Sequence, residues 1–111
     1  MKLPKRADNL QGSLDLLILK TLDSSPNHGF GITSHVKQAS EGLLKIEEGS
    51  LYPALHRMER EKLIAGSWST TDSGRKARLY SITPAGKKRL GEARDNWKTV
   101  ARGVKKVLKF N

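Results

Sequence analysis

The sequence contains no cysteine, and this absence excludes several classes of small protein. Without thiols there is no disulfide framework and no thiolate zinc site, so small disulfide-rich scaffolds and the cysteine-containing DNA-binding modules are ruled out. Long hydrophobic runs are also missing. The longest, Leu16 to Leu19, is far shorter than the roughly 20 residues of a membrane-spanning helix, and the N-terminus lacks the apolar core of a signal peptide. We therefore expect a cytoplasmic protein without a membrane segment.

Acidic residues are scarce relative to basic ones. The 111 residues include 11 Asp and Glu but 21 Lys and Arg, which gives a formal net charge of +10. Such a chain attracts polyanions, either nucleic acid or an acidic membrane surface. With 36% hydrophobic and 29% charged residues, the composition fits one small globular domain with a modest core.

Signals for catalysis are missing as well. The histidines His28, His35 and His56 lack the spacing of metal ligands, and the Glu47-Glu48 pair has no partner base. No nucleophile motif is present. We therefore predict that the protein is not an enzyme and that it holds no metal or cofactor.

The most informative segment runs from Glu47 to Arg60 and has the pattern of an amphipathic helix. Ser50 is a suitable N-cap, which predicts a helix start near Gly49 with Pro53 in the first turn. One face carries Leu51, Ala54, Leu55 and Met58, and the other carries Tyr52, Pro53, His56, Arg57 and Arg60. The second face suits a helix in the major groove of DNA, although an ordinary surface helix has the same pattern.

Two further helices are expected before this segment. Ser13 can cap a helix from Leu14 to about Ser24, with an inner stripe of Leu14, Leu17, Ile18 and Leu22. After a break at Ser25 to Gly29, a second helix is expected from about Phe30 to Ser40, with Ile32, Val36 and Ala39 inward. Leu43, Leu44 and Ile46 then resemble a short buried connector or a small strand. The basic residues of Met1 to Gln11 suggest a loose arm, either solvated or touching a phosphate backbone.

A β-hairpin is expected after the amphipathic helix. Leu63 to Thr71 alternates in polarity, Ala77 to Thr83 is rich in strand-forming residues, and Asp72-Ser73-Gly74 between them is a turn signal. The tip and the return strand are basic through Arg75, Lys76 and Arg78. A hairpin in this place is typical of the wing of a winged helix-turn-helix, whose basic tip contacts phosphates.

The last helix is predicted to begin at Pro84, with Thr83 as its N-cap, and to continue to about Leu108. Apolar residues recur at steps of three and four, the period of about 3.5 that is typical of a coiled-coil seam. This seam consists of Leu90, Ala93, Trp97, Val100, Val104 and Val107. It predicts dimerisation, while the basic remainder of the helix leaves open a membrane surface or a calmodulin-like partner.

Three blocks of the chain resemble the short type of PadR-family transcriptional regulator. They are His28-Gly29-Phe30-Gly31-Ile32, the whole segment from Glu47 to Arg60, and Leu79-Tyr80-Ser81-Ile82-Thr83-Pro84-Ala85-Gly86. The resemblance implies a winged helix-turn-helix homodimer that binds a two-fold symmetric operator in double-stranded DNA, usually as a repressor. It divides the chain into a basic arm (1–12), a winged helix-turn-helix domain (13–83) and a C-terminal dimerisation helix (84–111).

The resemblance also implies roles for individual residues. Ser50, Tyr52, Pro53, His56 and Arg57 fall on its recognition helix, and Arg75, Lys76 and Arg78 fall on its wing. Some relatives bind small aromatic molecules between tryptophans of the C-terminal helix, so Trp97 either binds such an effector or fills the dimer interface. A winged-helix module that binds protein instead of DNA is the alternative function. A MarR-like regulator would need more helix before the wing than this chain has.

Overall fold

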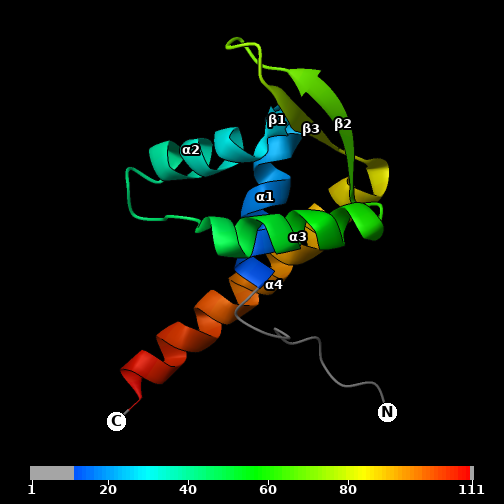
Figure 1. Cartoon of the computed structure of the whole chain (residues 1–111). Helices are drawn as coiled ribbons and strands as arrows, with labels where there is room; N and C mark the ends of the chain where they lie inside the picture. The colour runs from blue at the N-terminus through cyan, green and yellow to red at the C-terminus, as the bar shows by residue number, and fades with distance from the viewer. Residues whose placement is uncertain (1–11, 111) are drawn as a thin grey trace.

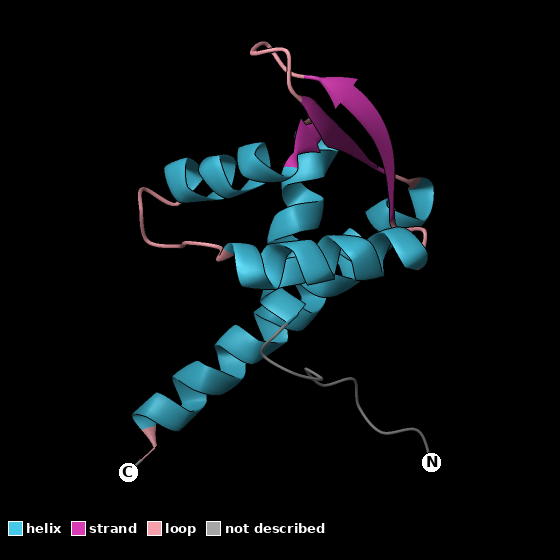
Figure 2. Ribbon diagram, in the orientation of Figure 1, coloured by secondary structure: helices cyan, strands magenta, loops and turns pink. Residues whose placement is uncertain are grey.

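The chain folds into four helices and a small antiparallel sheet, as the computed structural model of residues 12–110 shows (Figures 1 and 2). The predicted arm, residues 1–11, lies outside the described part. The elements are α1 (Gly12–Ser24), β1 (Asn27–His28), α2 (Gly29–Ala39), α3 (Glu48–Arg60), β2 (Ile64–Thr70), β3 (Lys76–Ile82) and α4 (Pro84–Lys109). The prediction of a mainly helical chain with a winged helix-turn-helix arrangement is confirmed.

Helix α1 is the central element of the core. Its residues Ile18, Leu19 and Leu22 are almost completely buried, because α2, β3 and α4 all pack against this helix. An apolar surface on nearly every side requires such covering, and α4 supplies part of it within the same chain. Ser13, predicted as the N-cap, lies inside the helix, which begins at Gly12.

The predicted buried connector after α2 is wrong. Leu43 is 85% and Leu44 45% exposed, no strand forms there, and of the three apolar residues Ile46 alone is buried. Glu41 and Gly42 both adopt positive φ, 55° and 81°, and these residues turn the chain away from the core as it leaves the helix. Ala39, predicted to face inward, is exposed in the last turn of α2.

Helix α3 presents the predicted apolar stripe to the core. Leu51, Ala54, Leu55 and Met58 are all buried, and this confirms the assignment of its two faces. The N-terminus differs from the prediction. Glu47 is the N-cap, and its carbonyl accepts hydrogen bonds from the N–H groups of Ser50 and Leu51 at 3.0 and 2.9 Å. Ser50 is therefore within the first turn, and Pro53 lies inside the helix, where its missing N–H leaves the Gly49 carbonyl without a helical donor.

The hairpin forms as predicted and gains a third strand. β2 and β3 pair from Ile64 with Ile82 to Thr70 with Lys76, and the turn between them places Gly74 at a φ of 80°. On its other edge, β3 pairs with β1 through Asn27 opposite Tyr80 and His28 opposite Leu79. The strand order β1-β3-β2 thus connects the start of α2 to the hairpin. We refer to β2, β3 and the tip at residues 71–75 as the wing.

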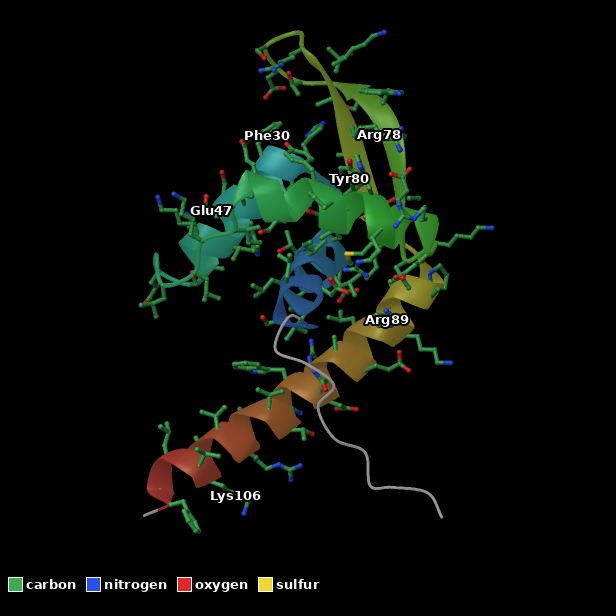
Figure 3. The ribbon with its side chains drawn as sticks, turned by 60° about the horizontal axis from the view of Figure 1, so that its bottom comes forward. Phe30, Glu47, Arg78, Tyr80, Arg89 and Lys106 are labelled. Carbon is green, nitrogen blue, oxygen red and sulfur yellow. The ribbon has the colours of Figure 1, made fainter. Side chains whose placement is uncertain are left out.

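Helix α4 begins inside the domain and ends outside it. Thr83 caps the helix, accepting a hydrogen bond from the Gly86 N–H at 3.1 Å, and Pro84 follows in the first turn, as predicted. Leu90 is the last residue of α4 that is buried in the core. The C-terminal turns of the helix project away from the other elements (Figures 1 and 3), and the molecule is consequently elongated, measuring 57 × 34 × 23 Å.

Candidate nucleic-acid interface

The outer face of α3 carries most of the side chains that the sequence assigned to DNA reading. Ser50, Tyr52, Pro53, His56 and Arg60 are exposed, because the residues between them fill the core and fix the rotation of the helix. Arg57 is more enclosed than its neighbours, with 38% of its side chain exposed. The helix therefore offers a phenol, an imidazole and one exposed guanidinium, that of Arg60, on a single surface.

The tip of the wing carries two exposed basic residues, Arg75 and Lys76. Thr71 shapes the turn that presents them: its N–H donates to the Arg75 carbonyl at 2.8 Å, and its carbonyl accepts from Gly74 at 2.9 Å. Its hydroxyl also accepts from the Arg75 N–H at 3.2 Å. These bonds close the turn, while the two basic side chains form no ion pair with any other described residue.

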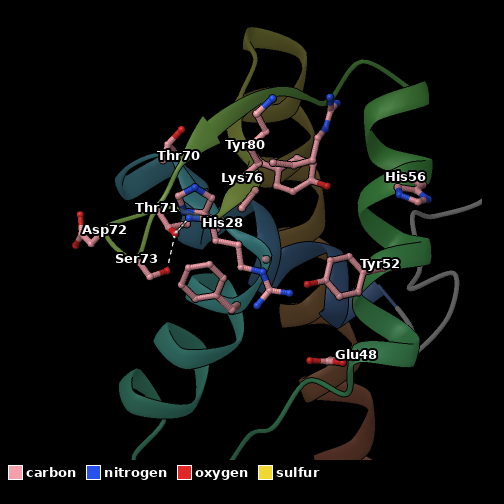
Figure 4. Close-up of a pocket in the computed structure, with 15 residues that line it drawn as sticks. His28, Glu48, Tyr52, His56, Thr70, Thr71, Asp72, Ser73, Lys76 and Tyr80 are labelled. Atoms are coloured by element: carbon pink, nitrogen blue, oxygen red, sulfur yellow. Dashed lines mark hydrogen bonds between the residues drawn. The ribbon is translucent and has the colours of Figure 1, made fainter.

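A single open groove separates α3 from the wing (Figure 4). It has a volume of about 950 Å³, and the start of α2 forms its floor. Tyr52 and His56 line it from the helix, Arg75 and Lys76 line it from the wing, and the two carboxylates of Glu48 and Asp72 lie at its margin. The exposed face of α3 and the basic tip of the wing thus border the same surface.

The motif His28-Gly29-Phe30 acquires a structural explanation in this groove. A Cβ at Gly29 would lie 3.0 Å from the Tyr52 hydroxyl and Cε1, so the missing side chain lets Tyr52 pack over the start of α2. The rings of His28 and Phe30 stack at 5.3 Å with an angle of 7° between their planes. The Nε2 atom of His28 is buried without a hydrogen-bond partner among residues 12–110. His28 and Phe30 were not assigned to the site from the sequence, although the motif itself was noticed.

Arg57 is held by carboxylates of its own chain. Its Nη2 atom donates to Asp15 of α1 at 2.5 Å, and its Nη1 atom donates to Glu61 at 3.3 Å. The hydrogen bond to Asp15 raises the pKa of Arg57 above its ordinary value, and this effect exceeds the opposing effect of partial burial. Arg57 was placed on the recognition helix from the sequence, and a contact with a DNA base would require its side chain to leave both carboxylates.

Arg78, the third basic residue assigned to the wing, lies on β3 opposite Trp68 and is directed toward α3. It pairs with Glu59 of α3, and its guanidinium lies 5.4 Å from the centre of the Trp68 ring. Gly66 makes room for it, because a Cβ there would come within 2.5 Å of the Arg78 Nη2 atom. Beside it, burial raises the pKa of the Tyr80 phenol, while Arg78 acts in the opposite direction. Arg78 thus joins the wing to α3.

The predicted seam of α4 divides into two parts. Leu90 belongs to the core of the protomer and is 6% exposed, so it is not available to a partner. Further along, Trp97 and Val104 are about half exposed, at 49% and 47%, and Val107 is 72% exposed. Ala93 and Val100 are half-buried. Trp97 also borders a shallow hollow with Asp95, Lys98, Thr99, Ala101 and Arg102.

Among residues 12–110, no cluster of at least three His, Cys, Asp or Glu is arranged to hold a metal ion. Within the same range, none of the helices combines the length and apolarity needed to cross a membrane. The groove between α3 and the wing is therefore the principal candidate site of the described chain.

The comparison of sequences agrees with this geometry. Residues 18–92 match the model of the transcriptional regulator PadR-like family, a range from α1 to the first turns of α4. The chain is also 32% identical over 94 residues to Transcriptional regulator Rv3488 of Mycobacterium tuberculosis, which covers 85% of this chain and 84% of that protein. An uncharacterized protein of Lysinibacillus sphaericus is 28% identical over 95 residues, or 86% of this chain and 87% of its own.

Solved structures share the fold over almost the whole length. A transcriptional regulator from Clostridium thermocellum has a TM-score of 0.80 at 25% identity, covering 90% of this chain and 97% of its own. A PadR-like transcriptional regulator from Bacillus cereus has a TM-score of 0.71 at 30% identity, covering 92% of this chain and 97% of its own. Taken with the winged helix-turn-helix arrangement and the basic groove, these matches establish that the chain belongs to the PadR-like family of transcriptional regulators.

Proposed function

We propose that the protein is a repressor that binds a two-fold symmetric DNA operator as a homodimer. In this proposal α3 lies in the major groove, and the wing crosses the neighbouring phosphate backbone. Residues 13–83 form the DNA-binding domain, residues 84–111 pair two copies, and the basic arm of residues 1–12 adds contacts to phosphates. Members of the matching family are transcriptional regulators, and the finer features are inferred from the surfaces of this chain.

The observation that carries the proposal is the groove shared by α3 and the wing. A duplex seated there would meet Tyr52 and His56 on one side and Arg75 and Lys76 on the other. Base choice would depend on the few side chains of α3 that reach base edges, among them Ser50, Tyr52, Pro53, His56 and Arg60. The wing and the helix ends would neutralise phosphates, and the release of counterions would supply much of the affinity.

The C-terminal half of α4 supports the pairing of two copies. Its exposed apolar residues follow one stripe, and a stripe of this period buries itself against a second helix. A two-fold axis would place the two α3 helices in successive major grooves, about 34 to 36 Å apart. Repression would follow if the operator overlaps a promoter, and the family resemblance favours a site near the protein's own gene.

The proposal is tested by selection of DNA from a random-sequence pool. The purified protein should enrich a pseudo-palindromic duplex, and its affinity for that duplex should fall steeply with salt. Arg75→Ala and Lys76→Ala should each weaken binding and reduce the salt slope by about one, the effect of one lost phosphate contact, whereas Arg60→Gln should weaken binding to the selected duplex more than binding to other duplexes. Lys109→Ala, a removal of one positive charge at the far end of α4, serves as the control and should leave the slope unchanged.

A protein-interaction module would give a different result. It would enrich no sequence from the pool, and any binding to DNA would be equal for all duplexes. A salt-independent interaction, or equal loss in the wing variants and the Lys109→Ala control, would reject the proposed DNA interface.

Trp97 leads to a second, dependent proposal, the binding of a small aromatic effector near the dimer axis. Its half-exposed ring and the hollow beside it provide a surface on which a planar ring can stack. Trp68→Phe leaves Trp97 as the single tryptophan of the chain. Saturable quenching of fluorescence by planar aromatics in this variant supports an effector site. Quenching that is linear and no stronger than for free tryptophan means that Trp97 only fills the interface.

A further inference from the structure

The basic residues around α3 fall into two groups that differ in their partners. In the described part of the chain, Arg60, Arg75 and Lys76 form no ion pair. Arg57 and Arg78, in contrast, each lie against a carboxylate from another element. A guanidinium that is paired with a carboxylate of the protein is not available to a phosphate or base, whereas an unpaired one is. The two groups therefore have different roles.

The pair between Arg57 and Asp15 joins elements that are far apart in the chain. The two residues are 42 positions apart, and the 2.5 Å contact links the last turn of α3 to the first turn of α1. Asp15 is the more enclosed partner, with 17% of its side chain exposed. If Arg57 moved out to a base, this carboxylate would remain partly buried without its charged partner, which is unfavourable.

Arg57 also connects α3 to the helix that would pair two copies. Its second partner, Glu61, lies 4.0 Å from Arg89 of α4, and Arg89 in turn lies 3.4 Å from Glu92. Figure 3 shows Arg89 near the beginning of α4, on the part that lies against the domain. A continuous series of charges therefore runs from Asp15 through Arg57 and Glu61 to Arg89, across three helices.

We propose that Arg57 is a positioning residue for DNA binding: it fixes α3 against α1 and α4 and does not itself contact the duplex. The inference depends on the proposed function, because the readout is affinity for DNA. Arg78 is held in a similar way, because it pairs with Glu59 and so joins α3 to strand β3 of the wing. The free basic residues then contact DNA, and the paired ones set the orientation from which they do so.

The decisive variant changes the partner instead of the arginine. If Arg57 contacts DNA, Asp15→Ala frees it and removes a repelling charge, so binding should stay the same or tighten. If Arg57 positions α3, the same variant should bind the selected duplex at least fivefold more weakly. Asp23→Ala is the matched control, because Asp23 is an exposed carboxylate on the same helix with no ion pair among residues 12–110.

Exchanging the charges of Arg57 and Asp15 distinguishes loss of the ion pair from loss of folding. Arg57→Asp should bind at least tenfold more weakly than the original chain, and adding Asp15→Arg should restore most of that loss by rebuilding the pair. Arg57→Asp with Asp23→Arg carries the same net charge and should not recover. Equal affinity of the two double variants, or an unchanged affinity in Asp15→Ala, would overturn the positioning role.

All measurements use the duplex selected by the original chain, at a temperature where thermal unfolding shows each variant to be folded. Failure of the original chain to select any duplex rejects the proposed function before the variants are made. If the original chain binds the duplex but Asp15→Arg does not restore the affinity lost in Arg57→Asp, only the positioning role of Arg57 is rejected.

Discussion

The two halves of α4 share one apolar stripe and have different surroundings. In the first half, Gly86 and Leu90 are buried against the sheet and α1, and the Thr83 hydroxyl donates to the Lys62 carbonyl just after α3. In the second half, Val107 and Leu108 are 72% and 79% exposed, although both are as apolar as the residues of the core. The hydrophobic pattern continues along the helix after the core has ended.

This difference shows which part of α4 contributes to the folding of a single chain. Burial of Leu90 contributes to the stability of one chain, whereas the exposed stripe after it contributes only when another surface covers it. Substitutions in the first half should therefore change unfolding, and substitutions in the second half should change association. Positions on α4 that look equivalent in the sequence should therefore respond differently to substitution.

The largest effect is expected at Gly86. An added Cβ would lie 2.0 Å from the Leu63 carbonyl oxygen and 2.8 Å from Ile82 Cγ1, so the start of α4 would have to move away from the sheet. Gly86→Ala should lower the free energy of unfolding by about 3 kcal/mol, as is found for overpacked sites. Gly91→Ala, one and a half turns further along with open space around it, should instead stabilise the helix by up to about 1 kcal/mol. Chemical denaturation of both variants measures the contrast, and equal effects would contradict it.

An effect on association is expected at Val104. Val104→Asp places a carboxylate on the exposed stripe, so the proposed dimer should dissociate at least tenfold more readily, which corresponds to about 1.4 kcal/mol. Unfolding of the separate protomer should hardly change. Arg102→Ala alters the charge by the same amount on the opposite side of the helix and should leave association intact. Sedimentation at several concentrations distinguishes the two, and a monomer in the original chain would remove the basis of the proposed two-fold binding.

The smallest of the three effects is expected at Thr83. Its hydroxyl accepts from the Gly86 N–H and lies 2.7 Å from the Lys62 carbonyl oxygen, so it joins the cap of α4 to the end of α3. Thr83→Ala should reduce stability by about 1 kcal/mol, the usual cost of a lost N-cap. Thr99→Ala removes a hydroxyl that bonds only to Asp95 within the helix, and its melting temperature should be unchanged or slightly higher.

Local patterns in the sequence predicted much of the fold. The stripe of Leu51, Ala54, Leu55 and Met58 has a helical period, so the buried side of α3 followed directly. Gly74 and the Thr83-Pro84 pair act through short-range geometry, and both formed the expected turn and cap. Signals of this kind depend on neighbours in the chain, and those neighbours are visible in the sequence.

Features set by distant partners could not be predicted in the same way. Arg57 and Arg78 have the composition of a DNA-reading surface, yet their carboxylate partners lie 42 and 19 positions away. The strand β1 is two residues long and exists because β3 lies beside it, which no local pattern indicates. Ser50 misled the assignment of the helix start, because a good capping residue can also lie within a first turn. The sequence gives the type of each residue, but the fold determines which residues lie beside it.

The central place of β3 has a consequence for the shape of the DNA. Because β3 is paired with β1, which directly precedes α2, the wing cannot tilt as a unit without breaking hydrogen bonds at the start of α2. If the protein binds DNA as proposed, the distance between α3 and the tip of the wing therefore stays constant. A duplex whose curvature or groove width does not match it must deform at an energetic cost that depends on its base steps, so operator choice extends to base pairs that no side chain reaches.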